Sequence, residues 1–123
     1  MAKKDVDERV KPIILTDTES GDKFTLEYSR ESVKFAESRG FKVDDVATYP
    51  MTKIPEMFYY AFRKNHRNVS RQKTDKLFFE GLGGHSNLPD GFVERLFALY
   101  TAPFDATDDR DGEEKNLTLT VEM

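Results

Sequence analysis

The sequence contains no cysteine and no tryptophan, and only two of its 123 residues are histidine. Without cysteine the protein has no disulfide bond, no thiolate nucleophile and no cysteine-ligated zinc. No apolar run approaches the roughly 18 residues that a membrane-spanning helix needs. Residues 1–11 hold no apolar stretch of the kind that marks a secretory signal. We therefore expect no membrane span, and we expect the cytoplasm as the compartment.

Aromatic residues supply most of the heavy apolar side chains, with ten phenylalanines and five tyrosines. Burying one such side chain stabilises a fold by about 1.5–3 kcal/mol, so these residues can sustain a modest core. A chain of this length favours one domain, which we assign to residues 11–104. Residues 1–10 are expected to form a flexible lead-in, and residues 105–123 an acidic tail.

Alternating apolar and polar residues predict a β-hairpin near the N-terminus. Residues 11–16 are a short β-rich run, and residues 17–22 have the composition of a turn. Residues 23–28 then place Phe24, Leu26 and Tyr28 on one face of a half-buried strand. Because an isolated hairpin is marginal in water, this face is expected to pack on helices.

Helical spacing and capping residues predict about four short helices. The first should run from a Ser29 cap to a stop at Gly40, and the second from a Thr52 cap to about Arg67. The remaining expectations are a Ser70-capped third helix through Leu77, Phe78 and Leu82, a fourth from Phe92 to before Pro103, and a short turn capped by Asp44 or Asp45. The predicted fold is thus α+β, a hairpin packed on about four short helices.

The C-terminal segment repeats the strand pattern, since Leu117, Leu119 and Val121 alternate with polar residues. Pattern alone leaves two interpretations open. The segment is either a third strand of the hairpin sheet or an extended tail.

The second predicted helix has two opposed faces. At helical spacing its core stripe comprises Ile54, Met57, Phe58, Ala61 and Phe62. At about 100° per residue, four other side chains fall on the opposite side: Tyr59, Tyr60, Arg63 and Arg67. Tyrosine and arginine are enriched at protein interfaces, so these four are the candidate partner-binding residues.

Charge is unevenly distributed along the chain, whose net charge is −4. Residues 53–76 hold seven basic and two acidic residues, whereas residues 101–123 hold seven acidic and two basic ones. Either the acidic tail folds back on the basic helix, or the basic face meets an acidic partner. Nucleic acid is the less favoured partner, because the whole chain is acidic and its own tail would compete for the basic patch.

No motif predicts catalysis, a cofactor or a metal. The glycines of residues 81–87 follow a helix and precede no Lys-Ser/Thr pair, so they indicate a helix stop rather than a phosphate loop. Residues 105–114 resemble a calcium loop, but alignment on Gly112 leaves threonine at the first and last ligand positions. His66 and His85 have no partners at ligand spacing. We therefore expect a protein that is not an enzyme.

Residues 49–66, YPMTKIPEMFYYAFRKNH, follow a hairpin and a serine-capped helix. This arrangement resembles the small tail assembly chaperones of long-tailed bacteriophages and prophages of Gram-positive bacteria. The likeness covers roughly residues 11–100, with Met57 where the family usually has leucine. It implies a non-enzymatic protein that coats the tape measure protein before the tail tube polymerises. It also implies self-association and, in many relatives, a longer product made by ribosomal frameshifting.

The leading hypothesis is accordingly a tail assembly chaperone that binds the tape measure protein. Two alternatives stay open: a head–tail connector or minor tail protein retained in the virion, and a nucleic-acid-binding regulator.

Overall fold

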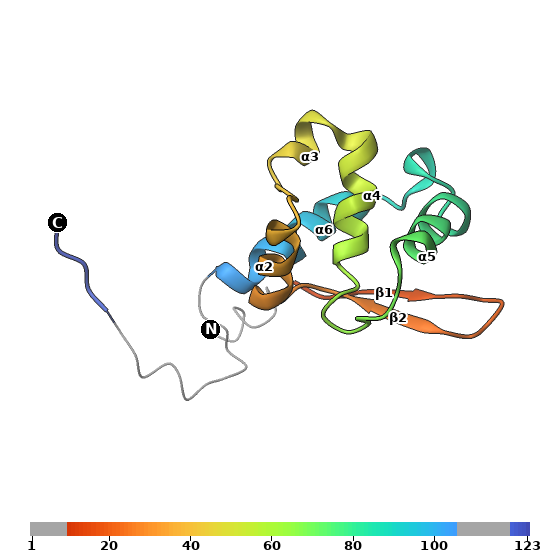
Figure 1. The fold of residues 1–123 in the computed structure, drawn as a ribbon, viewed down its shortest axis with the longest axis horizontal. Helices are drawn as coiled ribbons and strands as arrows, with labels where there is room; N and C mark the ends of the chain where they lie inside the picture. The colour runs from red at the N-terminus through yellow and green to blue at the C-terminus, as the bar shows by residue number, and fades with distance from the viewer. Residues whose placement is uncertain (1–9, 106–118) are drawn as a thin grey trace.

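The computed structural model describes residues 10–105 and 119–123 and confirms the predicted α+β class. Strands β1 (Ile13–Thr16) and β2 (Lys23–Leu26) form an antiparallel hairpin in which Ile13 lies opposite Leu26 and Leu15 opposite Phe24. The helices that follow are α2 (Arg30–Ser38), α3 (Asp45–Thr48), α4 (Pro50–Tyr60), α5 (Arg71–Lys76) and α6 (Phe92–Thr101). They gather on one side of the hairpin (Figure 1).

The hairpin forms where turn chemistry separates the two strand patterns. The Asp17 carboxylate accepts hydrogen bonds from the Glu19 and Ser20 N–H groups at 2.9 and 3.3 Å, and these bonds lower the pKa of Asp17. Gly21 takes the positive φ of 83° that the turn requires. Phe24, Leu26 and Tyr28 are all buried, which confirms the predicted core face. The strand itself ends at Leu26, so Tyr28 lies beyond β2 and not within it as predicted.

Helix α4 lies at the centre of the molecule and contacts α2, α3, α5 and α6. The predicted core stripe is confirmed, because all five of its residues are buried: Ile54, Met57, Phe58, Ala61 and Phe62. An aromatic chain then links the hairpin to the far helices. Phe24 packs on Phe62, Phe62 on Phe58, and Phe58 on Phe78, with ring centroids 5.5, 5.1 and 5.4 Å apart.

Both predicted ends of this helix are wrong. The helix begins at Pro50 rather than after Thr52, because proline lacks the N–H that a first helical residue leaves unpaired and already has a helical φ. Pro55 consequently lies inside the helix and not in its first turn. The helix ends at Tyr60 rather than near Arg67, so the basic residues beyond it do not form its last turn.

The caps of the neighbouring helices agree with the sequence interpretation. Ser29 caps α2 by accepting from the Ser32 N–H, and Gly40 ends the helix with a φ of 94°. Ser70 caps α5 by accepting from the Lys73 N–H. Helix α5 continues into a π-helical turn, Leu77–Gly81, and the last helix covers the predicted segment. Asp44 precedes α3 but makes no side-chain cap.

The sheet has two strands within the described residues, and residues 119–123 are in no strand. A third strand is therefore absent there, and Leu117 lies outside the described residues. The same holds for most of the lead-in and of the calcium-like segment, residues 1–9 and 106–118. In the portions of the chain that the structure describes, no helix is both long and apolar enough to cross a membrane.

Candidate functional site

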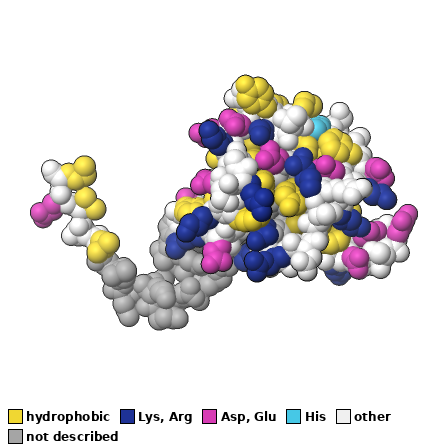
Figure 2. Space-filling model, viewed as in Figure 1, with side chains coloured by type: hydrophobic (Ala, Val, Ile, Leu, Met, Phe, Trp, Pro, Cys, Tyr) yellow, Lys and Arg dark blue, Asp and Glu magenta, His cyan; other side chains and the backbone are white. Residues whose placement is uncertain are grey.

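An open groove separates α2 from the chain that follows α4. Its volume is about 550 Å³. Its lining residues are Ser29, Glu31, Ser32, Lys34, Phe35, Ser38, Arg63, Lys64 and Arg67. Lysine and arginine side chains gather over α2 and the end of α4 on the face that Figure 2 shows. We call this feature the basic groove.

The first wall of the basic groove is α2, and its N-terminal turn is fixed by a reciprocal pair of hydrogen bonds. The Ser29 hydroxyl accepts from the Ser32 N–H at 3.1 Å, and the Ser32 hydroxyl accepts from the Ser29 N–H at 2.8 Å. This capping box satisfies donors that the helix start leaves unpaired. It sets the direction in which the helix presents Lys34 and Phe35 to the groove.

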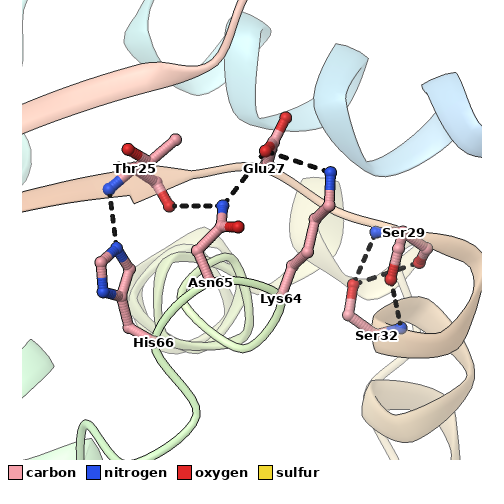
Figure 3. Close-up of polar contacts among 7 residues, drawn as sticks. All are labelled: Thr25, Glu27, Ser29, Ser32, Lys64, Asn65 and His66. Atoms are coloured by element: carbon pink, nitrogen blue, oxygen red, sulfur yellow. Dashed lines mark hydrogen bonds and ion pairs between the residues drawn. The ribbon is translucent and has the colours of Figure 1, made fainter. Parts of the chain in front are cut away.

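The second wall is residues 61–67, which bind the outer edge of β2 instead of continuing the helix (Figure 3). The Glu27 N–H donates to the Ala61 carbonyl at 3.1 Å, and the Thr25 N–H donates to His66 Nε2 at 2.9 Å. Asn65 Nδ2 donates to the Thr25 carbonyl at 3.2 Å. These bonds pair an exposed strand edge, which explains why α4 stops at Tyr60.

A salt bridge adds to this wall, since Lys64 Nζ lies 3.1 Å from a Glu27 carboxylate oxygen. That oxygen also accepts from Asn65 at 3.1 Å. The pair partly neutralises one of the four cations of the groove. Its worth to stability is small, because both side chains keep contact with water.

Phe35 forms the aromatic part of the groove, and two arginine side chains lie over its ring. The guanidinium carbon of Arg63 lies 3.7 Å from its ring centroid, and that of Arg39 lies 4.8 Å from the same centroid. Within residues 10–105 and 119–123, no ion pair involves Lys34, Arg39, Arg63 or Arg67. Like charges near one ring repel, so an acidic group entering the groove would relieve that repulsion.

The structure places the four predicted partner-binding residues in three environments. Arg63 and Arg67 both line the basic groove, Arg63 half-buried on Phe35 and Arg67 exposed. Tyr59 is half-buried, with the Arg71 guanidinium carbon 5.9 Å from its ring centroid. Tyr60 is only 7% exposed. The prediction of one surface made of all four is therefore wrong.

Tyr60 is buried because α2 and the loop after it pack on the side of α4 that the sequence pattern left open. Its ring lies 5.7 Å from Phe41 and 6.1 Å from Phe35, centroid to centroid. Burial raises the pKa of its phenol, and the nearby Glu56 carboxylate raises it further. Tyr60 thus supports the floor beneath Phe35, and only 7% of its surface is open to a partner.

Two residues that line the groove, Lys34 and Phe35, were not predicted as part of a site, whereas Lys64 belongs to the basic run predicted in residues 53–76. Lys34 and Phe35 belong to a different helix, so the pattern of α4 gave no reason to join them to it. Phe35 lies in the predicted first helix and is half-buried. An exposed lysine such as Lys34 is ordinary on a helix surface. Only the packing of α2 beside residues 63–67 makes it part of a site.

The chemistry that the groove offers is recognition of negative charge beside an apolar surface. Arginine presents a planar fork of donors to carboxylates, and the lysine stems add apolar contact. Neither histidine belongs to the groove: His66 binds Thr25, and His85 packs between Phe78 and Phe79. Among the residues that the structure describes, no three histidine, aspartate or glutamate side chains converge as a metal site would need.

One family model matches the whole chain, residues 1–123, and its description is domain of unknown function, DUF5055. The chain belongs to the DUF5055 family. No curated protein and no solved structure is significantly similar to it. The features of this DUF5055 domain that bear on its function are therefore the basic groove and the sequence pattern.

Proposed function

We propose that this DUF5055 domain is a non-enzymatic tail assembly chaperone of a phage or prophage that binds the tape measure protein in the host cytoplasm. Two independent lines support the proposal. One is the resemblance carried by residues 49–66, and the other is the basic groove built around the end of the same helix. The single observation that carries it furthest is the group of cations around Phe35 that form no ion pair with any described residue.

The groove suits an acidic, amphipathic helical segment. A segment with carboxylates on one side of an apolar stripe would set the carboxylates against Arg63, Arg67 and Lys34. Its apolar stripe would cover Phe35 and the aliphatic stems of the basic side chains. A helix lying along α2 would thus contact both the basic side chains and the apolar surface of the groove.

Each such contact is weak, and a coat on a long partner can use that. Exposed charge pairs contribute only about 0.2–1 kcal/mol each. A long helical partner presents many similar segments, so many copies of the chaperone can bind along it and reinforce one another if they also touch. Weak single contacts also let the coat leave when the tail tube takes its place.

Charge reversal at the exposed rim of the groove tests the surface assignment. We expect the Lys34→Glu, Arg67→Glu double variant to lose co-purification with a co-expressed tape measure protein, because both side chains are exposed and face the groove. The Lys42→Glu, Lys76→Glu double variant makes the same change in net charge at exposed residues outside the groove. It should bind as the parent does, and both variants should keep the parent's thermal stability.

Equal binding by both double variants would remove the groove from the proposal. Equal loss in both would show that net charge alone governs the interaction. Arg63 is left unchanged in this test because it packs on Phe35, where substitution would also disturb the fold.

Two other observations separate the proposed function from its alternatives. Mass spectrometry of purified virions should not detect a chaperone, whereas a connector or minor tail protein would be present. A gel-shift titration with duplex and single-stranded DNA and RNA at low salt would reveal a nucleic-acid-binding regulator, whose binding would weaken steeply as salt rises. In the genome, a reading frame for a very long helical protein just downstream would favour the chaperone.

A further inference from the structure

The outer edge of β1 is open, and the ladder geometry shows which groups it presents. The Asp17 N–H donates to the Asp22 carbonyl at 2.8 Å, so hydrogen-bonded pairs alternate from there along the hairpin. Ile14, opposite Thr25, and Thr16, opposite Lys23, are then non-hydrogen-bonded pairs. Their N–H and C=O groups point away from β2, and within the described residues none of them has a hydrogen-bond partner.

The opposite edge of the same hairpin is covered. The Thr25 N–H donates to His66 and the Thr25 carbonyl accepts from Asn65 (Figure 3). The Glu27 N–H donates to the Ala61 carbonyl. The chain thus pairs the β2 edge with its own loop and leaves the β1 edge without an equivalent. An exposed strand edge is a template for pairing with another strand.

Apolar side chains accompany this open edge. Ile13 and Leu15 face the core but stay half-buried, because β1 is an edge strand and no further strand of the described residues covers them. Ile14, on the other face, is 56% exposed. Leu15 and Thr16 also line an open groove of about 590 Å³ between the hairpin and α5. This groove gives space beside the Leu15–Thr16 end of β1, where an apolar residue of a further strand would cover Leu15.

The same chain carries a further segment with the sequence pattern of a strand. Residues 117–121, LTLTV, alternate apolar and polar residues at the spacing of a strand with one buried face. Leu119 is 80% exposed and Val121 is 78% exposed, so in this molecule neither packs on the hairpin. Residues 119–123 stand away from the folded body (Figure 1).

From these observations we infer that residues 117–121 of a second copy of the chain add to the open edge of β1 as a third strand. The N–H and C=O groups of Ile14 and Thr16 would pair with the incoming backbone, and Leu119 and Val121 would lie beside Ile13 and Leu15. Pairing would turn a two-stranded sheet, which is marginal by itself, into a three-stranded one. The inference does not rest on the proposed function, since it concerns the chain alone.

Two full-length variants separate the donor strand from the acceptor edge. Leu119→Asp with Val121→Asp places charge on the strand face that would be buried, and Thr118→Asp with Thr120→Asp places the same charge on the other face. Ile14→Pro removes an outward N–H without touching the bonds to β2, whereas Ile14→Thr keeps that N–H and changes only the side chain.

Sedimentation equilibrium over a range of concentrations gives the readout. The parent, the Thr118/Thr120 variant and the Ile14→Thr variant should associate with rising concentration. The Leu119/Val121 variant and Ile14→Pro should each stay monomeric. An equimolar mixture of these last two should form a one-to-one complex, because one retains the acceptor edge and the other retains the donor strand.

A parent chain that is monomeric at every concentration would overturn the inference, including the case in which the segment docks on its own hairpin. Association that persists in the Leu119/Val121 variant would overturn it as well. If Ile14→Pro fails to fold, by circular dichroism, the Leu119/Val121 variant still decides the matter, because it changes no residue of the folded body.

Discussion

At the scale of single residues, His66 joins the polar and apolar parts of the fold. Its Nε2 accepts from the Thr25 N–H, while its ring lies 5.3 Å from Phe24 and 6.3 Å from Phe62, centroid to centroid. One side chain thus pairs a strand edge and extends the aromatic core. The neighbouring Asn65 also binds Thr25 but is exposed and has no ring of its own to extend that core.

We expect His66→Ala to lower the free energy of unfolding by about 2 kcal/mol, because it leaves the Thr25 N–H unpaired and removes ring contacts. Asn65→Ala is the matched control and should cost about 0.5–1 kcal/mol, since water can replace an exposed amide. Urea unfolding of both variants measures the difference. Equal costs would mean that His66 contributes nothing beyond a surface hydrogen bond.

Three buried tyrosines lead us to predict that stability depends on pH in alkaline solution. Burial raises the pKa of Tyr28 and Tyr60 above 10.0, and it raises the pKa of Tyr100 to about 12, helped by the Glu37 carboxylate. Below pH 10 both the folded and the unfolded chain keep these protons, so the free energy of unfolding should not depend on them. Between pH 10 and about 12 the unfolded chain loses the Tyr100 proton while the folded chain keeps it, so stability should fall, and the raised pKa values of Tyr28 and Tyr60 act in the same direction.

Urea unfolding at successive pH values, with phenolate absorbance as a second probe, measures that fall. The Tyr100→Phe variant should lose stability less steeply across this window, since one of the linked protons is gone. Stability that stays level from pH 10 to 12 would contradict the assignment of raised pKa values.

At the scale of elements, local chemistry could be predicted from the sequence and tertiary competition could not. The Ser29 and Ser70 caps, the Gly40 stop and the buried face of β2 each depend on residues a few positions apart. The end of α4 depends on β2, whose outer edge competes for residues 61–66. Periodicity within one helix carries no information about such a competitor.

The candidate site divides in the same way. Arg63 and Arg67 were found because they share a helical face, and both line the groove. Tyr60 shares that face in projection but is covered by Phe35 and Phe41 from another part of the chain. Lys34 was missed for the converse reason, because only the packing of α2 beside residues 63–67 makes it part of a site.

Alanine substitutions at two glycines test whether the positive φ of Gly40 ends α2. Gly40 has a φ of 94° and open space where a Cβ would stand, so Gly40→Ala should cost about 1 kcal/mol from backbone strain alone. Gly81 has equally open space without a positive φ. Gly81→Ala should therefore be neutral or stabilise by about 0.5 kcal/mol through the unfolded state. Thermal unfolding of both variants measures this contrast, and equal destabilisation would contradict it.

At the scale of the whole molecule, opposite charges lie in different parts of one chain. Residues 53–76 carry a net +5, and residues 101–123 carry a net −5. The acidic segment is joined directly to the folded domain, so its effective concentration near the basic groove is high. Any acidic partner must therefore compete with the chain's own acidic residues.

Ending the chain after Asp105 removes six acidic and two basic residues and brings the net charge from −4 to zero. We expect the shortened chain to bind a polyglutamate probe several-fold more tightly than the full chain at low salt, with the difference vanishing at high salt, where exposed charges are screened. A full-length variant in which the same six acids, Arg110 and Lys115 are all changed to asparagine or glutamine has the same net charge of zero and keeps the length of the chain and residues 117–121. It should bind like the shortened chain if charge is responsible. Fluorescence anisotropy of the labelled probe measures all three, and equal affinities at low salt would show that the tail does not compete for the groove.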